Sequence, residues 1–136
     1  MAETIRLVDY FYIDAPNKPG EAARALASIR DAGVNLLAFS GFPRGRRAQL
    51  DFIPVDSQAF VKAARQAGLK LSVRKTGFLI DGEDRVGALA DLLEKLAAAK
   101  INVTAVDAIC AGENCYGAIL WVKPPDRKKA AKALGI

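Results

Sequence analysis

The 136-residue sequence contains no histidine, one methionine, one tryptophan and only two cysteines. Without histidine, the chain cannot supply a Ser-His-Asp triad or a metal site with imidazole ligands. Two cysteines are too few for the disulfide framework of a small secreted module, so we expect Cys110 and Cys115 to be free thiols in a reducing compartment. Carboxylate chemistry stays open, but the sequence shows no paired acids. We therefore expect no enzymatic activity, no metal and no cofactor.

Long apolar runs are also missing. No stretch approaches the roughly 18 apolar residues that a membrane span needs, and the first residues lack a basic segment followed by an apolar one. Hydrophobic residues make up 51% of the chain and charged residues 26%, which is the usual balance of a globular protein with a core. These observations predict a cytoplasmic protein that does not contact membranes.

The net charge of +5 comes from basic residues that gather in two places. Arg44, Arg46 and Arg47 crowd one glycine-containing turn, and Lys123, Arg127, Lys128 and Lys129 lie near the C-terminus. Such clusters are compatible with a polyanionic partner or with ordinary solvated charge on a hairpin tip and a helix face.

An internal repeat organises the chain. Shifting the sequence by 67 residues aligns Phe11–Leu69 with Phe78–Ile136 without a gap and gives 15 identities over 59 positions. The matches include Gly20 with Gly87, Asn35 with Asn102 and Gly45 with Gly112, and we expect each pair to be structurally equivalent. The repeat predicts two small units, residues 1–74 and residues 75–136.

Hydrophobic periodicity predicts a βαββαβ order in each unit. In the first copy, the expected strands are Val8–Ile13, Val34–Phe42, Leu50–Val55 and Leu69–Val73, and the expected helices are Glu21–Ala32 and a second that Asp56 and Ser57 cap and that ends at Gly68. In the second copy, the expected strands are Phe78–Asp81, Ile101–Ile109 and Tyr116–Val122, and the expected helices are Val86–Ala99 and Pro125–Leu134.

The second copy has no counterpart of the first copy's fourth strand, because Ile136 aligns with Leu69. The same 67-residue shift places residues 3–9 against residues 70–76. We therefore expect residues 3–14 and 70–81 to form two long antiparallel strands that each cross from one unit's sheet to the other's, with residues 3–8 supplying the missing strand. Such an exchange would leave no orphan sheet edge beside Phe78–Asp81.

Two segments resemble the signature of ACT domains, in which a D/N-R/K-P-G turn precedes a helix and then A-G-I/V-N. The first runs from Asn17-Lys18-Pro19-Gly20 through its helix to Gly33-Val34-Asn35, and the second from Asp84-Arg85-Val86-Gly87 to Lys100-Ile101-Asn102. The resemblance covers nearly the whole chain twice with its spacing kept. Two departures stand out: Val86 replaces the signature proline, and Glu21 replaces an apolar residue.

The resemblance to a tandem ACT protein implies an α+β fold of two ferredoxin-like βαββαβ units, with antiparallel sheets and both helices of each on one face. It also implies unit pairing in a homodimer, regulation of a metabolic enzyme, and an amino-acid effector bound between units. Carried over position by position, the ligand-binding residues would be Asn17, Lys18, Pro19, Gly20 and Asn35 in the first copy and Asp84, Arg85, Gly87 and Asn102 in the second.

Elementary chemistry supports this placement. Each loop ends at a helix N-terminus, whose free N–H groups and positive dipole end suit a carboxylate. An asparagine amide can both donate to a carboxylate and accept from an ammonium group, so Asn17 and Asn35 could hold the two ends of an amino acid. The alternative is that these asparagines only cap the turn and the strand start.

Other functions remain open from the sequence. Tyr10, Phe11 and Tyr12 on one strand near a basic turn are compatible with RNA binding, although the glycine-and-aromatic pattern of RNA-recognition sheets is absent. A scaffold that only dimerises or docks on a metabolic enzyme is a further alternative. Cys110 and Cys115 flank one predicted turn and could meet across it, but two thiols make a poor zinc site and core-side cysteine is common.

Overall fold

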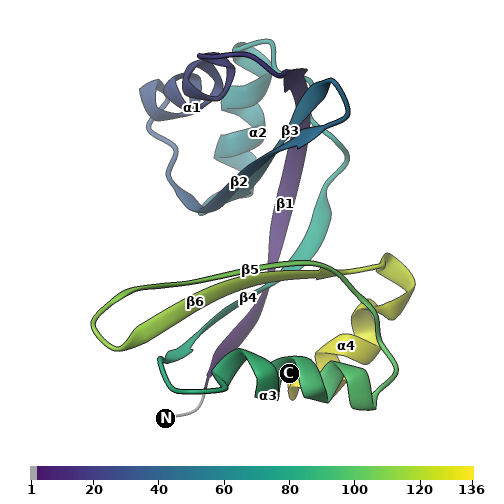
Figure 1. The fold of residues 1–136 in the computed structure, drawn as a ribbon. Coiled ribbons are helices and arrows are strands. Elements are labelled where there is room, and N and C mark those ends of the chain that lie inside the picture. The colour runs from purple at the N-terminus through teal and green to yellow at the C-terminus, as the bar shows by residue number, and fades with distance from the viewer. Residues whose placement is uncertain (1–2) are drawn as a thin grey trace. The chain divides into compact units, whose positions relative to one another are not determined.

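The computed structural model describes residues 3–136, which divide into two compact units. The first unit is Asp9–Lys75, and the second is Thr76–Ile136 together with residues 3–8. Each unit is a sheet with two helices on one face (Figure 1). Among the described residues, no helix is both long and apolar enough to span a membrane.

The first unit contains the strand order β2-β3-β1. Its elements are β1 (Thr4–Pro16), α1 (Glu21–Asp31), β2 (Leu36–Arg44), β3 (Arg47–Pro54) and α2 (Ser57–Gln66). The antiparallel register pairs Phe11 with Phe52 and Arg44 with Arg47. The ring centroid of the fully buried Phe60, on α2, lies 5.4 Å from that of Phe11 and 5.3 Å from that of Phe52. This aromatic cluster fixes α2 to the sheet.

The second unit repeats this arrangement with the strand order β1-β4-β6-β5. Its elements are β4 (Lys75–Glu83), α3 (Ala88–Ala98), β5 (Val103–Gly112), β6 (Cys115–Val122), the 3-10 turn η1 (Pro124–Asp126) and α4 (Arg127–Leu134). Leu92 and Leu96 of α3 and Leu120 of β6 are almost completely buried in one core. The two helices and the sheet are held together by this apolar layer.

Strand β1 is shared between the units. Its first residues belong to the second unit, where Ile5 packs against the core that contains Leu92 and Leu96. Glu3 lies beside Gly82, at which an added Cβ would come within 2.8 Å of the Glu3 side chain. From Asp9 onward, β1 belongs to the first unit.

The segment 69–74 differs from the expectation, because it is not a regular strand. Its backbone is hydrogen-bonded to β1 at Tyr12, where Ser72 N donates to Tyr12 O (2.8 Å) and Tyr12 N donates to Ser72 Oγ (3.0 Å). Regular strand geometry begins only at Lys75. The expected long strand over 70–81 is therefore wrong for its first five residues, because a serine side chain replaces a backbone acceptor there.

The β5–β6 hairpin of the second unit contains one residue more than the β2–β3 hairpin of the first. The partners Phe11 and Phe52 correspond to Phe78 and Leu120, so the offset between copies is 67 residues in β4 but 68 in β6. The register of β5 shifts between Cys110 and Gly112, which is the mark of a β-bulge. Gly45 lies inside its two-residue turn, whereas Gly112 pairs with Cys115 before the turn. The expectation that Gly45 and Gly112 are equivalent is therefore wrong.

The bulge also separates the two cysteines. Cys110 pairs with Tyr116, whereas Cys115 is the next residue along β6 and points to the other face. Both thiols are free and exposed, so the expectation of core-side cysteines is wrong. Cys110 Sγ instead donates to Asp84 Oδ2 at 3.1 Å.

Candidate ligand-binding loops

Two equivalent loops connect a strand to the first helix of each unit. Gly20 and Gly87 are the N-cap residues of α1 and α3, with φ angles of +90° and +80°. An added Cβ would meet nothing within 4 Å at either position, so glycine is needed for its backbone conformation and not for space. Neither helix receives a side-chain cap.

The helix starts consequently keep free donors. The first N–H of each helix bonds back into the loop, from Glu21 to Lys18 O and from Ala88 to Arg85 O. The next two N–H groups of each helix have no partner among the described residues: those of Ala22 and Ala23 in α1, and of Leu89 and Ala90 in α3. Unpaired donors at the positive end of a helix dipole favour an anion.

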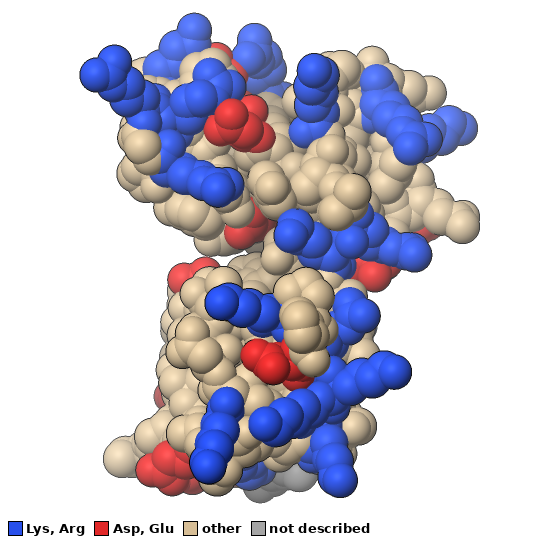
Figure 2. Space-filling view, turned by 90° about the vertical axis from the view of Figure 1, so that its right-hand side faces the viewer, with Lys and Arg blue, Asp and Glu red and all other residues tan. Residues whose placement is uncertain are grey.

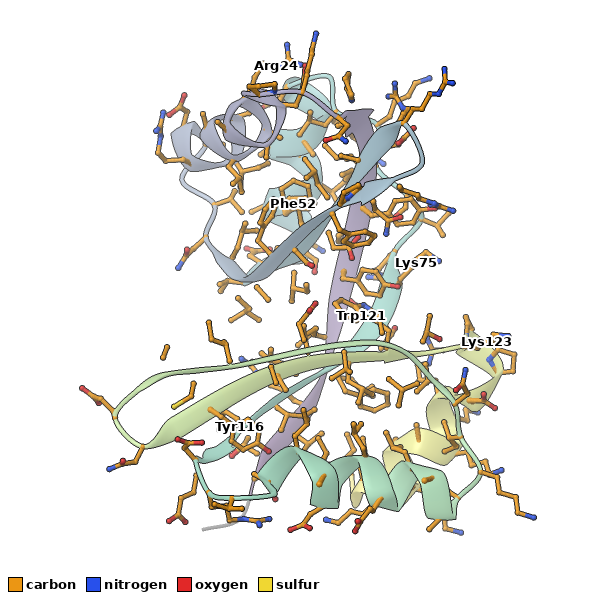
Figure 3. All side chains as sticks on the ribbon, viewed as in Figure 1. Arg24, Phe52, Lys75, Tyr116, Trp121 and Lys123 are labelled. Atoms are coloured by element: carbon orange, nitrogen blue, oxygen red, sulfur yellow. The ribbon has the colours of Figure 1, made fainter. Side chains whose placement is uncertain are left out.

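A hollow lies beside each loop. In the second unit it has a volume of about 280 Å³, and α3 faces the end of β5 across it. Its lining includes three expected residues, Asp84, Arg85 and Gly87, and adds Cys110 and Tyr116. Figure 3 shows Tyr116 on the side of β6 that faces α3.

The corresponding hollow of the first unit has a volume of about 370 Å³. Asn17 and Lys18 line it from the loop, and Phe39 and Phe42 line it from β2. Pro19 and Gly20 belong to the same loop and are exposed. The two hollows therefore occupy the same place in the two copies.

Electrostatics distinguish the hollows. In the first unit, the Glu21 carboxylate at the first turn of α1 pairs with Arg24 and lies 3.7 Å from Lys18 Nζ. Its side chain is only 12% exposed. A negative charge of the chain itself thus already lies at the helix start, where an effector carboxylate would bind.

In the second unit, Ala88 stands where the first has Glu21, and the acid in the first turn of α3 is instead Asp91. Arg85 Nη2 lies 2.8 Å from Asp91 Oδ2 and 3.9 Å from Glu3 Oε1, and the hydrogen bond to Asp91 raises the pKa of Arg85. Burial, and then the charge of Glu3, raise the pKa of Tyr116. These contacts fix the positions of Arg85 and Tyr116 at the wall of the hollow.

Asn35 and Asn102 lie elsewhere. They follow the C-terminal ends of α1 and α3, and neither lines a hollow described above. Eleven helical residues rise about 16 Å, so no single amino acid can contact both Asn17 and Asn35 within one unit. Asn35 Oδ1 accepts from Leu36 N at 2.9 Å, which is the local capping role weighed as the alternative.

The sequence reasoning missed Glu3, Cys110 and Tyr116. A signal for two of them existed, because strands on either side of a crossover helix end at the same edge of a sheet. The end of β5 must therefore lie near the loop after β4. Among the described residues, no group of three or more Cys, Asp or Glu could hold a metal ion.

The basic clusters are exposed and partly neutralised. Arg47 Nε lies 2.7 Å from Asp14 Oδ2, and Arg44 Nη1 donates to Gln49 Oε1 at 2.9 Å. Arg127 donates to Thr76 Oγ1 at 3.0 Å. On the face seen in Figure 2, Lys and Arg outnumber Asp and Glu on each unit.

Comparison with known proteins rests on structure, because no family model and no curated protein sequence matches the chain. Protein BT0572 from Bacteroides thetaiotaomicron superposes with a TM-score of 0.80 at 19% identity, over 94% of this chain and 88% of that one. The regulatory subunit of aspartate kinase from Thermus thermophilus gives 0.66 at 16% identity, over 97% and 93%. The corresponding subunit from Thermus flavus gives 0.64 at 16% identity, over 98% and 95%.

The chain has a tandem ACT-like fold. This confirms the predicted α+β class with two βαββαβ units and helices on one face of each sheet. The ACT-like fold serves as a regulatory subunit in the two Thermus proteins. At these identities the likeness establishes the fold.

Proposed function

We propose that this ACT-like chain is a non-catalytic regulatory protein that binds an amino acid at the loops after β1 and β4. The observation that carries the proposal is the repeated loop, where a positive-φ glycine, an uncapped helix and two free N–H groups border a hollow in each unit. The volumes of about 280 and 370 Å³ suit a ligand of amino-acid size. The regulatory role of the same fold in aspartate kinase supports it.

The proposed site extends the loop residues with an asparagine from another unit. The loop residues are Asn17, Lys18, Pro19 and Gly20 in the first unit and Asp84, Arg85 and Gly87 in the second. Asn35 and Asn102 precede β2 and β5, which are the outermost strands of the sheets. Pairing two chains along such an edge would carry an asparagine to a neighbouring chain, so the proposal includes a homodimer.

The two hollows should not bind equally. Glu21, the acid in the first turn of α1, lines the hollow of the first unit, whereas Asp91, the acid in the first turn of α3, pairs with Arg85 and does not line the hollow of the second unit. Like charges repel, so an effector carboxylate is expected to prefer α3, with Arg85 beside it. Exposed free thiols are compatible with the reducing cytoplasm as the site of action.

A second candidate function is a scaffold that dimerises or docks on a metabolic enzyme without binding an effector. The observation favouring it is β5, a ten-residue edge strand with most of its residues exposed, including Ile109 at 70%. Long exposed edges recruit further strands.

Thermal denaturation with each of the twenty amino acids separates these functions. A ligand at 100 times its Kd stabilises the folded state by about 2.7 kcal/mol and raises Tm. We expect one or a few amino acids to do so for the effector protein and none to do so for the scaffold.

A matched pair of variants locates the effector. Ala90 and Ala23 are exposed residues at the same place in α3 and α1. Ala90→Glu puts a carboxylate into the first turn of α3, a position that helices favour for acids, and should abolish the Tm shift. Ala23→Glu should leave the shift intact. A shift that survives Ala90→Glu and disappears in Ala23→Glu would show that the first unit is the sensor and overturn the preference argued above.

A further inference from the structure

A groove of about 870 Å³ lies between α2 and the extended segment 69–74 of the first unit, and we name it the α2 groove. Its apolar lining includes Phe11, Val61, Leu69 and Leu71. It shares no lining residue with the two hollows beside the loops. Whatever binds there would therefore act apart from the proposed effector sites.

The edge of the α2 groove offers unused backbone donors. Ser72 points its N–H toward β1, where it bonds to Tyr12 O. The N–H groups of its neighbours Leu71 and Val73 do not bond to β1. Neither has a hydrogen-bond partner among the described residues. Such an edge accepts one further strand.

The charge of the α2 groove is positive. Lys62 and Arg65 are exposed on α2 and form no ion pair with any described residue. Arg74 at the other end lies 3.9 Å from Asp9 Oδ2, at the limit of an ion pair. No acidic residue lines the groove. Because the chain itself carries +5, a second copy is a poor electrostatic match and an acidic partner is a good one.

We propose that the α2 groove binds an extended acidic segment of a partner protein, of the form acid-x-apolar-x-acid. Alternate residues of a strand share one face, so the two acids would lie about 13 Å apart with the apolar residue between them. The ten-residue helix α2 spans about 15 Å. Its length therefore matches two carboxylates held near Arg65 and Arg74 and an apolar side chain packed on Val61 and Leu71.

A synthetic peptide tests this directly. The probe is a fluorescent, end-blocked Ser-Glu-Thr-Leu-Thr-Glu-Ser peptide, compared with a copy that has lysine for glutamate and a copy N-methylated on its central backbone. Fluorescence anisotropy should show binding of the first with a Kd below about 1 mM, and binding of the other two should be at least about tenfold weaker.

Charge-reversal variants of the full chain complete the test. Lys62→Glu with Arg65→Glu should weaken binding of the acidic peptide by about tenfold or more, whereas Lys128→Glu with Lys132→Glu on α4 applies the same change of charge elsewhere and should leave it within about twofold. Circular dichroism establishes that both variants fold. An amino-acid Tm shift that persists in the groove variant separates this proposal from the proposed function.

Several outcomes would overturn the proposal. Equal weakening by both pairs would show unspecific attraction to a basic protein. No binding at 1 mM, or equal binding of the lysine peptide, would remove the acidic partner. If glutarate displaces the peptide at equal concentration, the groove is a small-anion site. If the groove variant instead changes the sedimentation of the protein alone, its occupant is a second copy.

Discussion

The sharing of β1 between the units can be tested at Ile5. This side chain is half-buried against the core of the second unit, whereas Leu7, two residues along the same strand, is 49% exposed. Truncating a fully buried isoleucine to alanine costs about 2–5 kcal/mol. Because Ile5 is half-buried, we expect Ile5→Ala to destabilise the second unit by roughly 1–2 kcal/mol.

Native-state hydrogen exchange measures where this loss occurs. A loss of 1–2 kcal/mol raises the opening equilibrium by about 5–30-fold. We expect faster exchange in peptides from α3 and β6 and little change in those from α1 and β3. Leu7→Ala is the matched control and should change exchange much less. Faster exchange in α1 and β3, with α3 and β6 unaffected, would refute the assignment of residues 3–8 to the second unit.

Two further predictions follow from the geometry. Burial and the nearby Asp51 raise the pKa of Tyr10 from its ordinary value of 10 to about 12, so Tyr10 ionises in the unfolded state at a lower pH than in the folded state. The free energy of unfolding should therefore fall between pH 10 and 12. Urea denaturation at each pH should show this fall, and it should be smaller in Tyr10→Phe. Oxidation should not join Cys110 to Cys115 within one chain, because the bulge directs them to opposite faces of the hairpin; mass spectrometry of a protein oxidised when dilute should find no such link, and a quantitative one would contradict the register.

The repeat made most of the fold predictable from the sequence. Glycines with positive φ end or begin the helices in both copies, as at Gly20, Gly68 and Gly87, and their identity survives the duplication. Apolar residues keep the spacing of the helix faces, so α1 and α3 fall within two residues of their expected bounds at each end. Such local signals need no knowledge of the partner elements.

The same repeat led to a wrong prediction of which side chains of β6 face the core. A gapless shift of 67 residues carries the inward Leu50 and Phe52 onto Gly117 and Ile119, yet the helices contact Tyr116, Ala118 and Leu120. One bulged residue in β5 reverses which side chains of β6 point inward, because side chains alternate along a strand. Because positions 45 and 112 are both glycine, the gapless alignment gave no sign of this extra residue.

Only the loop residues of the candidate site could be predicted from the sequence. The uncapped helix starts follow from the sequence, but the walls of the hollows come from β2, β5 and β6 and depend on strand order. Asn35 and Asn102 remain predicted ligand contacts. Each lies about one helix length from the loop of its own unit, so it could reach an effector there only from another unit. Which unit would face them is not encoded in the local sequence.

The two copies have diverged where charge matters most. Each helix has one acid in its first turn, Glu21 in α1 and Asp91 in α3. Glu21 lines the hollow of its unit, whereas Asp91 pairs with Arg85 and does not line the hollow of the second unit. An effector carboxylate at α1 would therefore meet a like charge, which weakens its interaction with the helix dipole. The second unit should then gain more stability than the first when an amino acid binds. Under the two proposals above, the second unit would bind the effector and the first would hold the partner segment in the α2 groove, which is a division of roles that suits regulation of a separate enzyme.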